Sequence, residues 1–256
     1  MFLGGSIPVA RETLVARRAI APEPELRFEQ VSHRYRQGTP VLDGLSLTLG
    51  VGTTGLVGVN GAGKTTLIRI AAGSLAPWQG TVTSSGVDLY GRSRQEGLST
   101  VAWMPQAGSL PRGLTAVELV TYLSWMRGQS WRVARKRAMS ALEQVELSDQ
   151  AATRVERLSG GMARRVWLAQ ALAADAQVLL LDEPSTGLDP RQRATMVRLL
   201  GRLQHRVVLL SSHILEDVAE LANRVLVLDE GRIIYDGDRP DRLDAAWFAR
   251  QTGVNR

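Results

Sequence analysis

Short apolar runs and segments of helical periodicity alternate along most of the chain. Near the N-terminus, Leu26 and Phe28 alternate with polar residues and predict a strand over residues 26–31, and a second strand is predicted over residues 41–49. Two shorter strand candidates follow, at residues 80–83 and 100–104. This part of the chain therefore predicts mainly β structure.

The second half of the chain carries three strongly apolar runs separated by helical segments. The runs are residues 178–181, 207–210 and 225–228. Runs without polar alternation are typical of strands that are buried on both faces of a parallel sheet. An antiparallel pair around Gly231 and a helix near residues 241–250 end the pattern. These elements together predict the α/β fold class.

The segment between the two strand-rich regions is different in kind. Residues 114–126 have helical periodicity, Gly128 ends that helix, and Ser130 can cap a second helix over residues 131–145. We interpret residues 107–160, approximately, as an inserted helical subdomain. The domain around it is predicted to span residues 25–237, after an N-terminal extension of residues 1–24 that ends in Pro-Glu-Pro and before a C-terminal helix and tail at residues 238–256.

The composition narrows the class of protein. A hydrophobic content of 44% and a charged content of 22% are those of an ordinary globular protein. The sequence contains no run of about 18 apolar residues that could span a membrane. Its first ten residues do not resemble a signal peptide. The absence of cysteine excludes disulfides and thiolate metal sites, which suits the cytosol.

The net charge of +6 comes almost entirely from arginine, because Lys64 and Lys136 are the only lysines. The arginines are scattered along the chain, as in the pair Arg164 and Arg165, and no basic stripe interleaved with aromatic residues predicts a nucleic-acid groove. We therefore favour solvated helix faces for these arginines. Attraction to an anionic membrane surface is the second interpretation.

The strongest chemical signal is a glycine-rich loop between an apolar run, residues 55–57, and a helical segment, residues 66–72. Glycines let backbone N–H groups surround an anion, and the N-terminus of the following helix points at the same place. The pattern predicts a nucleoside triphosphate site in which Lys64 reaches the β- and γ-phosphates and Thr65 binds Mg²⁺. The candidate phosphate-binding residues are Gly58, Asn60, Gly61, Ala62, Gly63, Lys64, Thr65 and Thr66.

Two adjacent carboxylates follow the apolar run at residues 178–181. The carboxyl end of a strand is where open α/β sheets place ligand-binding residues. We expect Asp182 to bind Mg²⁺ opposite Thr65, and Glu183 to polarise the attacking water as general base.

A second anion-binding helix N-terminus is predicted at residues 158–162, Leu-Ser-Gly-Gly-Met, before a helix that runs to about residue 173. Ser159 can cap that helix, and Gly160 and Gly161 leave its amide groups open to an anion. A chain with a single phosphate-binding loop does not by itself need a second anion-binding helix N-terminus, so this second one calls for an explanation.

Together these motifs resemble the ATP-binding cassette (ABC) ATPase family, whose signature Leu-Ser-Gly-Gly-Gln is matched at four of five positions. The resemblance covers residues of about 26–237, with the motifs in family order. It implies a P-loop NTPase core with a mixed, mainly parallel sheet, an N-terminal antiparallel β subdomain and an inserted α-helical subdomain. It also implies head-to-tail docking of two cassettes, each signature closing over ATP held by the other's phosphate loop.

Further site residues come from this resemblance. Tyr35 is similar to the aromatic residue that stacks on adenine, and Gln106 to the glutamine that touches Mg²⁺ or the attacking water. Asp189 is similar to the residue of the loop that crosses the dimer interface. His213, after residues 207–210, resembles the histidine that senses the γ-phosphate. His33 and His205 are interpreted as surface residues.

Met162 departs from the family's glutamine and cannot donate its amide hydrogen bonds, although the phosphate-facing residues are kept. Such Met-containing signatures resemble those of exporter-type cassettes with separate membrane subunits. The resemblance therefore implies an ATPase subunit at the cytoplasmic face of the membrane, which dimerises on ATP and powers a separate permease. The alternative is an ABC-type ATPase that acts on nucleic acid or the ribosome. The chain lacks the heptads of the coiled-coil members and the second cassette of the translation-type members.

Overall fold

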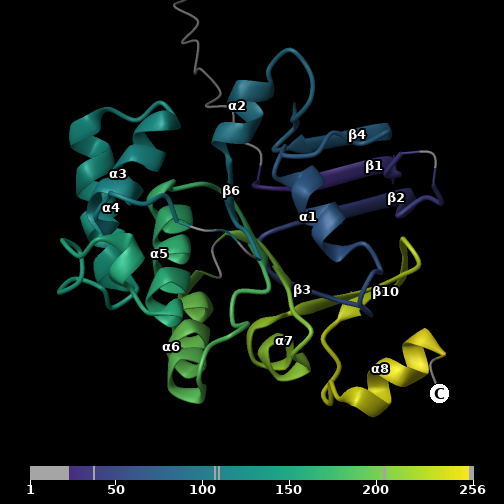
Figure 1. Ribbon diagram of the computed structural model, residues 1–256. Helices are drawn as coiled ribbons and strands as arrows, with labels where there is room; N and C mark the ends of the chain where they lie inside the picture. Colours follow the sequence, from purple (N-terminus) through teal and green to yellow (C-terminus); the bar gives the residue numbers. More distant parts are fainter. Residues whose placement is uncertain (1–22, 37, 107, 109, 204–205, 254–256) are drawn as a thin grey trace, which may run out of the picture.

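The computed structural model describes residues 23–36, 38–106, 108, 110–203 and 206–253 (Figure 1). The predicted N-terminal extension, residues 1–24, lies outside the described residues except for its last two. The described chain forms two sheets with α1 (Lys64–Ala71) between them, and a group of helices lies on the far side of the larger sheet (Figure 1).

A six-stranded, mainly parallel sheet forms the centre of the fold. Its order is β10-β9-β3-β8-β7-β6, and only the pair β9 and β10 is antiparallel. The three predicted apolar runs form strands of this sheet, and the antiparallel pair around Gly231 is confirmed. The strands are β3 (Gly52–Val57), β6 (Val101–Met104), β7 (Val178–Asp182), β8 (Val207–Ser211), β9 (Arg224–Asp229) and β10 (Arg232–Asp238).

The two faces of this sheet pack against different partners. In β7, Leu180 belongs to the cluster that contains α1, whereas Leu179 and Leu181 belong to the cluster that contains α5 (Gly160–Ala173). Because successive side chains of a strand point to opposite faces, a strand covered on both sides is apolar at every position. This arrangement explains why the central strands read as unbroken apolar runs.

A smaller antiparallel sheet covers the other side of α1. Its order is β2-β1-β4-β5, and Leu26 and Phe28 of β1 pack in one cluster with Leu67 and Ile68 of α1. The strands predicted over residues 26–31 and 41–49 are therefore confirmed as β1 and β2. The strands are β1 (Leu26–His33), β2 (Leu42–Leu49), β4 (Gln79–Ser84) and β5 (Val87–Asp88).

The predicted helical pair is present as α3 (Ala116–Met126) and α4 (Trp131–Gln144). Thr115 and Glu118 form a capping box at the start of α3, and the Ser130 hydroxyl accepts from the N–H of Val133 at the start of α4. Both helices pack against α5 in one apolar cluster.

The remaining helices lie around these layers. The last helix starts later than the pattern predicted, because the Asp244 carboxylate accepts from the N–H of Trp247 and so caps it at that point. Among the described residues, no helix combines the length and the apolar character needed to cross a membrane. The helices are α2 (Arg94–Ser99), α6 (Pro190–Leu200), α7 (Leu215–Leu221) and α8 (Ala245–Thr252), with short 3₁₀ turns at Val155–Arg157 and Gly201–Leu203.

Candidate functional site

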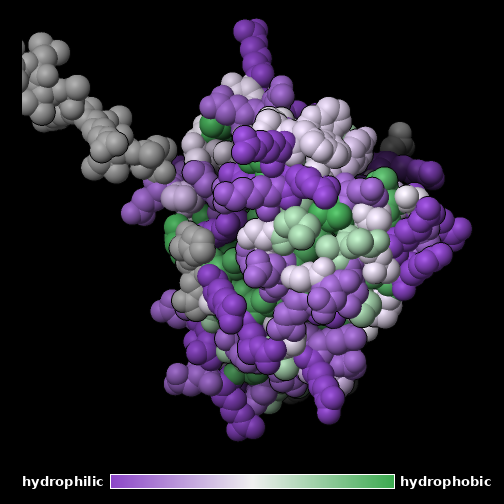
Figure 2. Space-filling view, turned by 90° about the vertical axis from the view of Figure 1, so that its left-hand side faces the viewer, coloured by the Kyte–Doolittle hydropathy of each residue, from purple (hydrophilic) through white to green (hydrophobic). Residues whose placement is uncertain are grey.

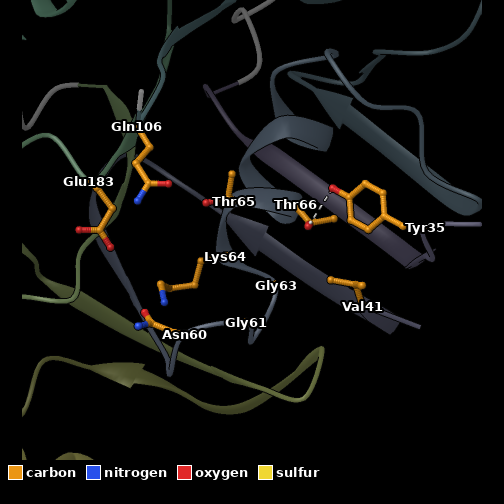
Figure 3. A pocket seen from close by; sticks show the side chains of 10 residues that line it. All are labelled: Tyr35, Val41, Asn60, Gly61, Gly63, Lys64, Thr65, Thr66, Gln106 and Glu183. Atoms are coloured by element: carbon orange, nitrogen blue, oxygen red, sulfur yellow. Dashed lines mark hydrogen bonds between the residues drawn. The ribbon is translucent and has the colours of Figure 1, made fainter. Parts of the chain in front are cut away.

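A cavity of about 360 Å³ opens at the carboxyl end of β3, beside α1. Gln106 and Glu183 lie at one end of it, Tyr35 and Val41 at the other, and the glycine-rich loop lies between them (Figure 3). The cavity brings together most of the predicted site, and its lining residues are Tyr35, Val41, Asn60, Gly61, Gly63, Lys64, Thr65, Thr66, Gln106 and Glu183.

The loop between β3 and α1 depends on its glycines. Gly63 has a φ of 109°, and a Cβ there would lie 2.8 Å from the carbonyl oxygen of Val41. A Cβ on Gly58 would lie 2.3 Å from the carbonyl oxygen of Leu228. The loop can therefore pass under β2 and beside β9 only without side chains at these positions. Its backbone then enters the N-terminus of α1, where an anion is stabilised by the helix dipole.

The Lys64 ammonium folds back on this loop. Its Nζ donates to the carbonyl oxygens of Gly58 at 2.7 Å and Val59 at 3.2 Å. Burial lowers the pKa of Lys64, and the nearby carboxylates of Glu183 and Asp182 oppose that effect. A phosphate in the cavity would supply the negative charge that this buried cation lacks.

The Asp182 carboxylate has one satisfied and one unsatisfied oxygen. Oδ1 accepts from the hydroxyls of Ser211 at 2.7 Å and Thr65 at 3.4 Å, whereas Oδ2 is buried and has no partner. Burial raises the pKa of Asp182, the hydrogen bonds from Ser211 and Thr65 oppose this, and the Glu183 charge adds to it. A cation would satisfy both the charge and the open oxygen.

This donor set fits Mg²⁺. Mg²⁺ in nucleotide sites is held by one or two protein oxygens together with phosphates and water, rather than by a complete protein cage. Asp182 and Thr65 meet across the end of the cavity, with Gln106 on its wall. Consistent with such a partial site, the described part of the chain holds no group of three or more His, Cys, Asp or Glu placed to bind a metal.

Glu183 has a backbone conformation that is rare for a residue with a side chain, with a φ of 52°. Its N–H donates to Ser211, at 3.1 Å to the carbonyl and 3.0 Å to the hydroxyl oxygen. Its Oε2 accepts from the Thr186 hydroxyl at 3.2 Å and from the backbone N–H of His213 at 3.3 Å. Strain that is held by such contacts is typical of functional sites.

Arg164, on the second turn of α5, joins the strand ends that carry these groups. Its guanidinium donates to the carbonyl oxygens of five residues: Pro105, Gln106, Asp182, Glu183 and Pro184. The interpretation of Arg164 as part of a solvated helix face is wrong, because only 9% of the residue is exposed. Arg164 fixes the spacing between the end of β6 and the end of β7.

Tyr35 lies at the opposite end of the cavity from Glu183 (Figure 3). Its hydroxyl is 3.2 Å from the Thr66 hydroxyl, and its ring meets the His33 ring edge to face, with centroids 4.9 Å apart. The prediction of His33 as a surface residue is wrong, since it is 7% exposed, and His205, predicted likewise, lies outside the described residues. Tyr35 and Val41 give this end of the cavity an aromatic and an aliphatic side chain.

The second glycine pair lies outside the cavity. The exposed hydroxyl of Ser159 accepts from the N–H of Met162 at 3.3 Å, as predicted for a cap, and Gly160 has open space around it. Gly161 has a packing role, because a Cβ there would lie 2.3 Å from Oε1 of Gln192. Asp189 is also exposed and caps α6. None of these residues lines the chain's own cavity.

Four predicted residues support the site without lining the cavity, and three others were missed by sequence reasoning. Gly58, Ala62, Asp182 and His213 belong to the first group. Val41, Arg164 and Ser211 belong to the second. Ser211 is the last residue of β8 and directly precedes Ser212 and His213. Its place at the carboxyl end of a strand could have identified it as a site residue. Val41 and Arg164 had none, because their contacts are distant in sequence.

Comparisons with known proteins agree with this geometry. The family model described as ABC transporter matches residues 42–186. The Nod factor export ATP-binding protein I of Paraburkholderia xenovorans (strain LB400) is 38% identical over 219 residues, which are 84% of this chain and 71% of that protein. The protein of the same name from Rhizobium meliloti is 40% identical over 207 residues, which are 80% of this chain and 61% of that protein.

Solved structures share the fold. A bacterial Atm1-family ABC exporter with ATP bound has a TM-score of 0.77 at 25% identity, covering 93% of this chain and 43% of that one. CbiO1 of Clostridium perfringens, part of the ABC transporter complex CbiONQ, has a TM-score of 0.74 at 26% identity, with 84% and 89% covered. The dimeric bacterial ABC transporter cassette MJ0796 has a TM-score of 0.76 at 23% identity, with 84% and 99% covered.

Proposed function

The chain belongs to the ABC transporter family, and from that premise we propose that it is the ATP-binding and hydrolysing subunit of an exporter with a separate permease. The observation that carries the proposal is the cavity, whose two ends differ in chemistry. The loop glycines, Lys64 and Thr65 suit a triphosphate, and Tyr35 and Val41 suit the base. The relatives named as export ATP-binding proteins support the direction of transport.

When ATP is bound, each residue of the site has a separate role in its hydrolysis. The loop amides and Lys64 hold the β- and γ-phosphates and stabilise the charge that develops as the terminal bond breaks. Glu183 accepts a proton from the attacking water, and His213 keeps the Glu183 carboxylate aimed at that water. Asp182 and Thr65 would hold Mg²⁺, which would supply positive charge to the phosphates. Gln106 would contact the metal or the attacking water from the cavity wall.

A second copy or a related cassette completes the site. Ser159, Gly160 and Asp189 are exposed and do not line the cavity, so they are accessible to a partner cassette. We propose that the N-terminus of α5 closes over the γ-phosphate held by a partner cassette. The dimeric arrangement of the MJ0796 cassette, which has the same fold, supports this mode.

The permease would dock in a groove of about 600 Å³ beside Gln106. Trp103, Pro105, Gly108, Leu123 and Trp167 line it together with the polar residues Arg127 and Gln170. This mixed lining fits an amphipathic permease helix, and Gln106, next to Pro105 in the chain, would transmit nucleotide binding to that helix. We also propose that the chain lies at the cytoplasmic face of the membrane. We also propose the domain division at residues 25–237, with the helical subdomain at about 107–160.

The proposal is tested by capture of Glu183→Gln protein from detergent-solubilised membranes in the presence of Mg²⁺ and ATP. A permease and a second cassette should co-purify, because the variant binds ATP and does not hydrolyse it. Lys64→Ala is the matched control, since it should lose ATP and with it the cassette dimer. Recovery of a nucleic acid or ribosomes instead of a membrane protein, or ATPase activity of Lys64→Ala equal to wild type, would refute the assignment.

A further inference from the structure

Four exposed apolar side chains gather at the turn between α3 and α4. Tyr122, Trp125 and Met126 share one face of α3 at i, i+3 and i+4 spacing, and Trp131 begins α4. The residues are 42%, 48%, 62% and 51% exposed. The ring centroids of Trp125 lie 6.0 Å from Tyr122 and 6.3 Å from Trp131. We call these four residues the aromatic patch.

The fold does not need the aromatic patch for its core. The opposite face of α3 is buried through Val117, Val120 and Ser124, and that face packs against α4 and α5. Three large aromatic side chains left in contact with water, and with one another, indicate a surface that is covered in use.

All charged residues in the part of the sequence that contains the aromatic patch are basic. Residues 119–142 contain five basic residues and no acidic one: Arg127, Arg132, Arg135, Lys136 and Arg137. Arg127 lies between Trp125 and Trp131 in sequence, and the other four basic residues follow Trp131. Figure 2, which looks onto this side of the molecule, shows pale, near-neutral side chains among purple, hydrophilic ones in its upper part.

These cations differ in how far neighbouring elements neutralise them. Arg137 pairs with Asp175 at 2.8 Å, and Arg135 lies close enough to Glu118 to help lower the pKa of that carboxyl, after its hydrogen bonds with Thr115. Arg132 and Lys136 are exposed and enter no ion pair within the described ranges. Their charge is therefore available to an anionic surface.

We propose that the aromatic patch, with Arg132 and Lys136, binds the surface of an anionic lipid bilayer. Tryptophan and tyrosine prefer the boundary between water and hydrocarbon, and nearby basic residues are attracted by anionic headgroups. A uniform positive charge suits a bilayer better than a protein partner, because the core of a protein interface is depleted of charged residues. A groove for single-stranded nucleic acid places its aromatic residues between flanking cations, whereas these side chains lie on one outer face of a helix turn.

The position of the aromatic patch agrees with this assignment, and this step rests on the proposed function. Leu123 and Arg127, on the neighbouring face of α3, line the groove proposed for the permease helix. Arg127 also donates to the carbonyl oxygens of Leu98, Ser99 and Val101, which fixes the patch relative to α2 and β6. A cassette seated on a permease by that groove would turn the aromatic patch toward the headgroups beside it.

The test is flotation of the purified full-length chain, without permease or nucleotide, with vesicles of phosphatidylcholine alone or mixed with phosphatidylglycerol. The wild-type chain should float with the mixed vesicles only, and added salt should weaken binding. Arg132→Gln with Lys136→Gln should weaken binding about thirtyfold. Trp125→Ala with Trp131→Ala should weaken it at least tenfold. Trp78→Ala, an equally exposed tryptophan elsewhere, is the matched control and should bind as wild type.

Thermal unfolding and basal ATPase activity show that each variant is folded, and neither should change. The inference is wrong if the wild-type chain floats with neither vesicle, if the patch variants bind as well as Trp78→Ala, or if a DNA or RNA oligonucleotide displaces the chain from vesicles at equal phosphate concentration. If flotation fails while a permease still co-purifies with Glu183→Gln, the lipid contact is refuted and the proposed function stands.

Discussion

The imidazole of His213 meets the carboxylate of Glu183, with Nδ1 2.5 Å from Oε2. A carboxylate only accepts hydrogen bonds, so the hydrogen of this contact resides on Nδ1. The Glu183 carboxylate is 6% exposed and the His213 side chain 54% exposed. The pair therefore connects a buried group at the cavity wall to a residue that solvent, or a partner subunit, can reach.

Glu183→Gln should lower ATP turnover by about 10²- to 10⁴-fold, because the amide cannot accept the proton of the attacking water. ATP binding should persist, since Lys64 and the loop glycines are unchanged. A coupled ATPase assay and ATP-dependent dimerisation by size-exclusion chromatography measure the two effects. Glu216→Gln, on an exposed position of α7, is the control. Turnover of Glu183→Gln near wild type would assign the base to another group.

Asp182→Asn should raise the thermal stability of the nucleotide-free protein and abolish Mg²⁺-dependent hydrolysis. Burial raises the pKa of Asp182, so the folded state holds that proton more tightly than the unfolded state does. The related stability is present below the unfolded pKa and is lost as pH rises through the folded pKa. The stability difference between Asp182→Asn and wild type should therefore grow as the pH rises from the unfolded to the folded pKa of Asp182. Differential scanning calorimetry in EDTA at several pH values tests this, and a lower midpoint at pH 7 would contradict it.

Arg164→Lys should lower both stability and turnover. A lysine ammonium has three donors on one atom and cannot reach the five carbonyl groups that the guanidinium joins. We expect a loss of about 2–4 kcal/mol in the free energy of unfolding, because each hydrogen bond to a charged group is worth about 1.5–3 kcal/mol. Denaturant titration measures it, and steady-state kinetics report kcat.

Arg165→Lys is the matched control for this prediction. Its guanidinium donates to the carbonyl oxygens of Val145 and Glu146, at the end of α4. This variant should lose stability without a comparable loss of kcat per folded molecule. Equal effects of the two substitutions on kcat would show that Arg164 does not position the site.

Tyr90→Phe should destabilise the protein by about 1–3 kcal/mol at pH 7, because the substitution removes the single O–H donor that two carbonyl groups share. The Tyr90 hydroxyl donates to the carbonyl oxygens of Ile70 and Leu75, at the end of α1. Burial raises the pKa of Tyr90 to about 12. The neutral hydroxyl therefore stabilises the fold below the unfolded pKa of about 10, and this contribution is lost as pH rises through the folded value.

Denaturant unfolding of wild type and Tyr90→Phe at pH 7 and above pH 10 measures this difference. The two proteins should converge in stability at the higher pH. A constant difference across that range would mean that the hydroxyl does not titrate with folding.

Local sequence patterns predicted most of the helices and strands of the fold. The apolar runs at β7, β8 and β9 predicted a buried parallel sheet, since a strand covered on both faces has no polar position. Caps at Ser130 and Ser159 placed two helices, because a side-chain oxygen that satisfies the first N–H groups acts within three residues. The boundary of α8 was misplaced because its cap, Asp244, had equally plausible neighbours in sequence.

The sequence by itself determined the phosphate-binding loop, since Gly58, Gly63, Lys64 and Thr65 act within one turn of chain and their spacing is sufficient. Only the tertiary structure showed which further residues complete the site around that loop. Val41 reaches the cavity from the position before β2, Arg164 joins carbonyl groups of two strand ends, and Ser211 orients both Asp182 and Glu183. These contacts join residues far apart in sequence, so their identity depends on how the layers pack, which no local pattern encodes.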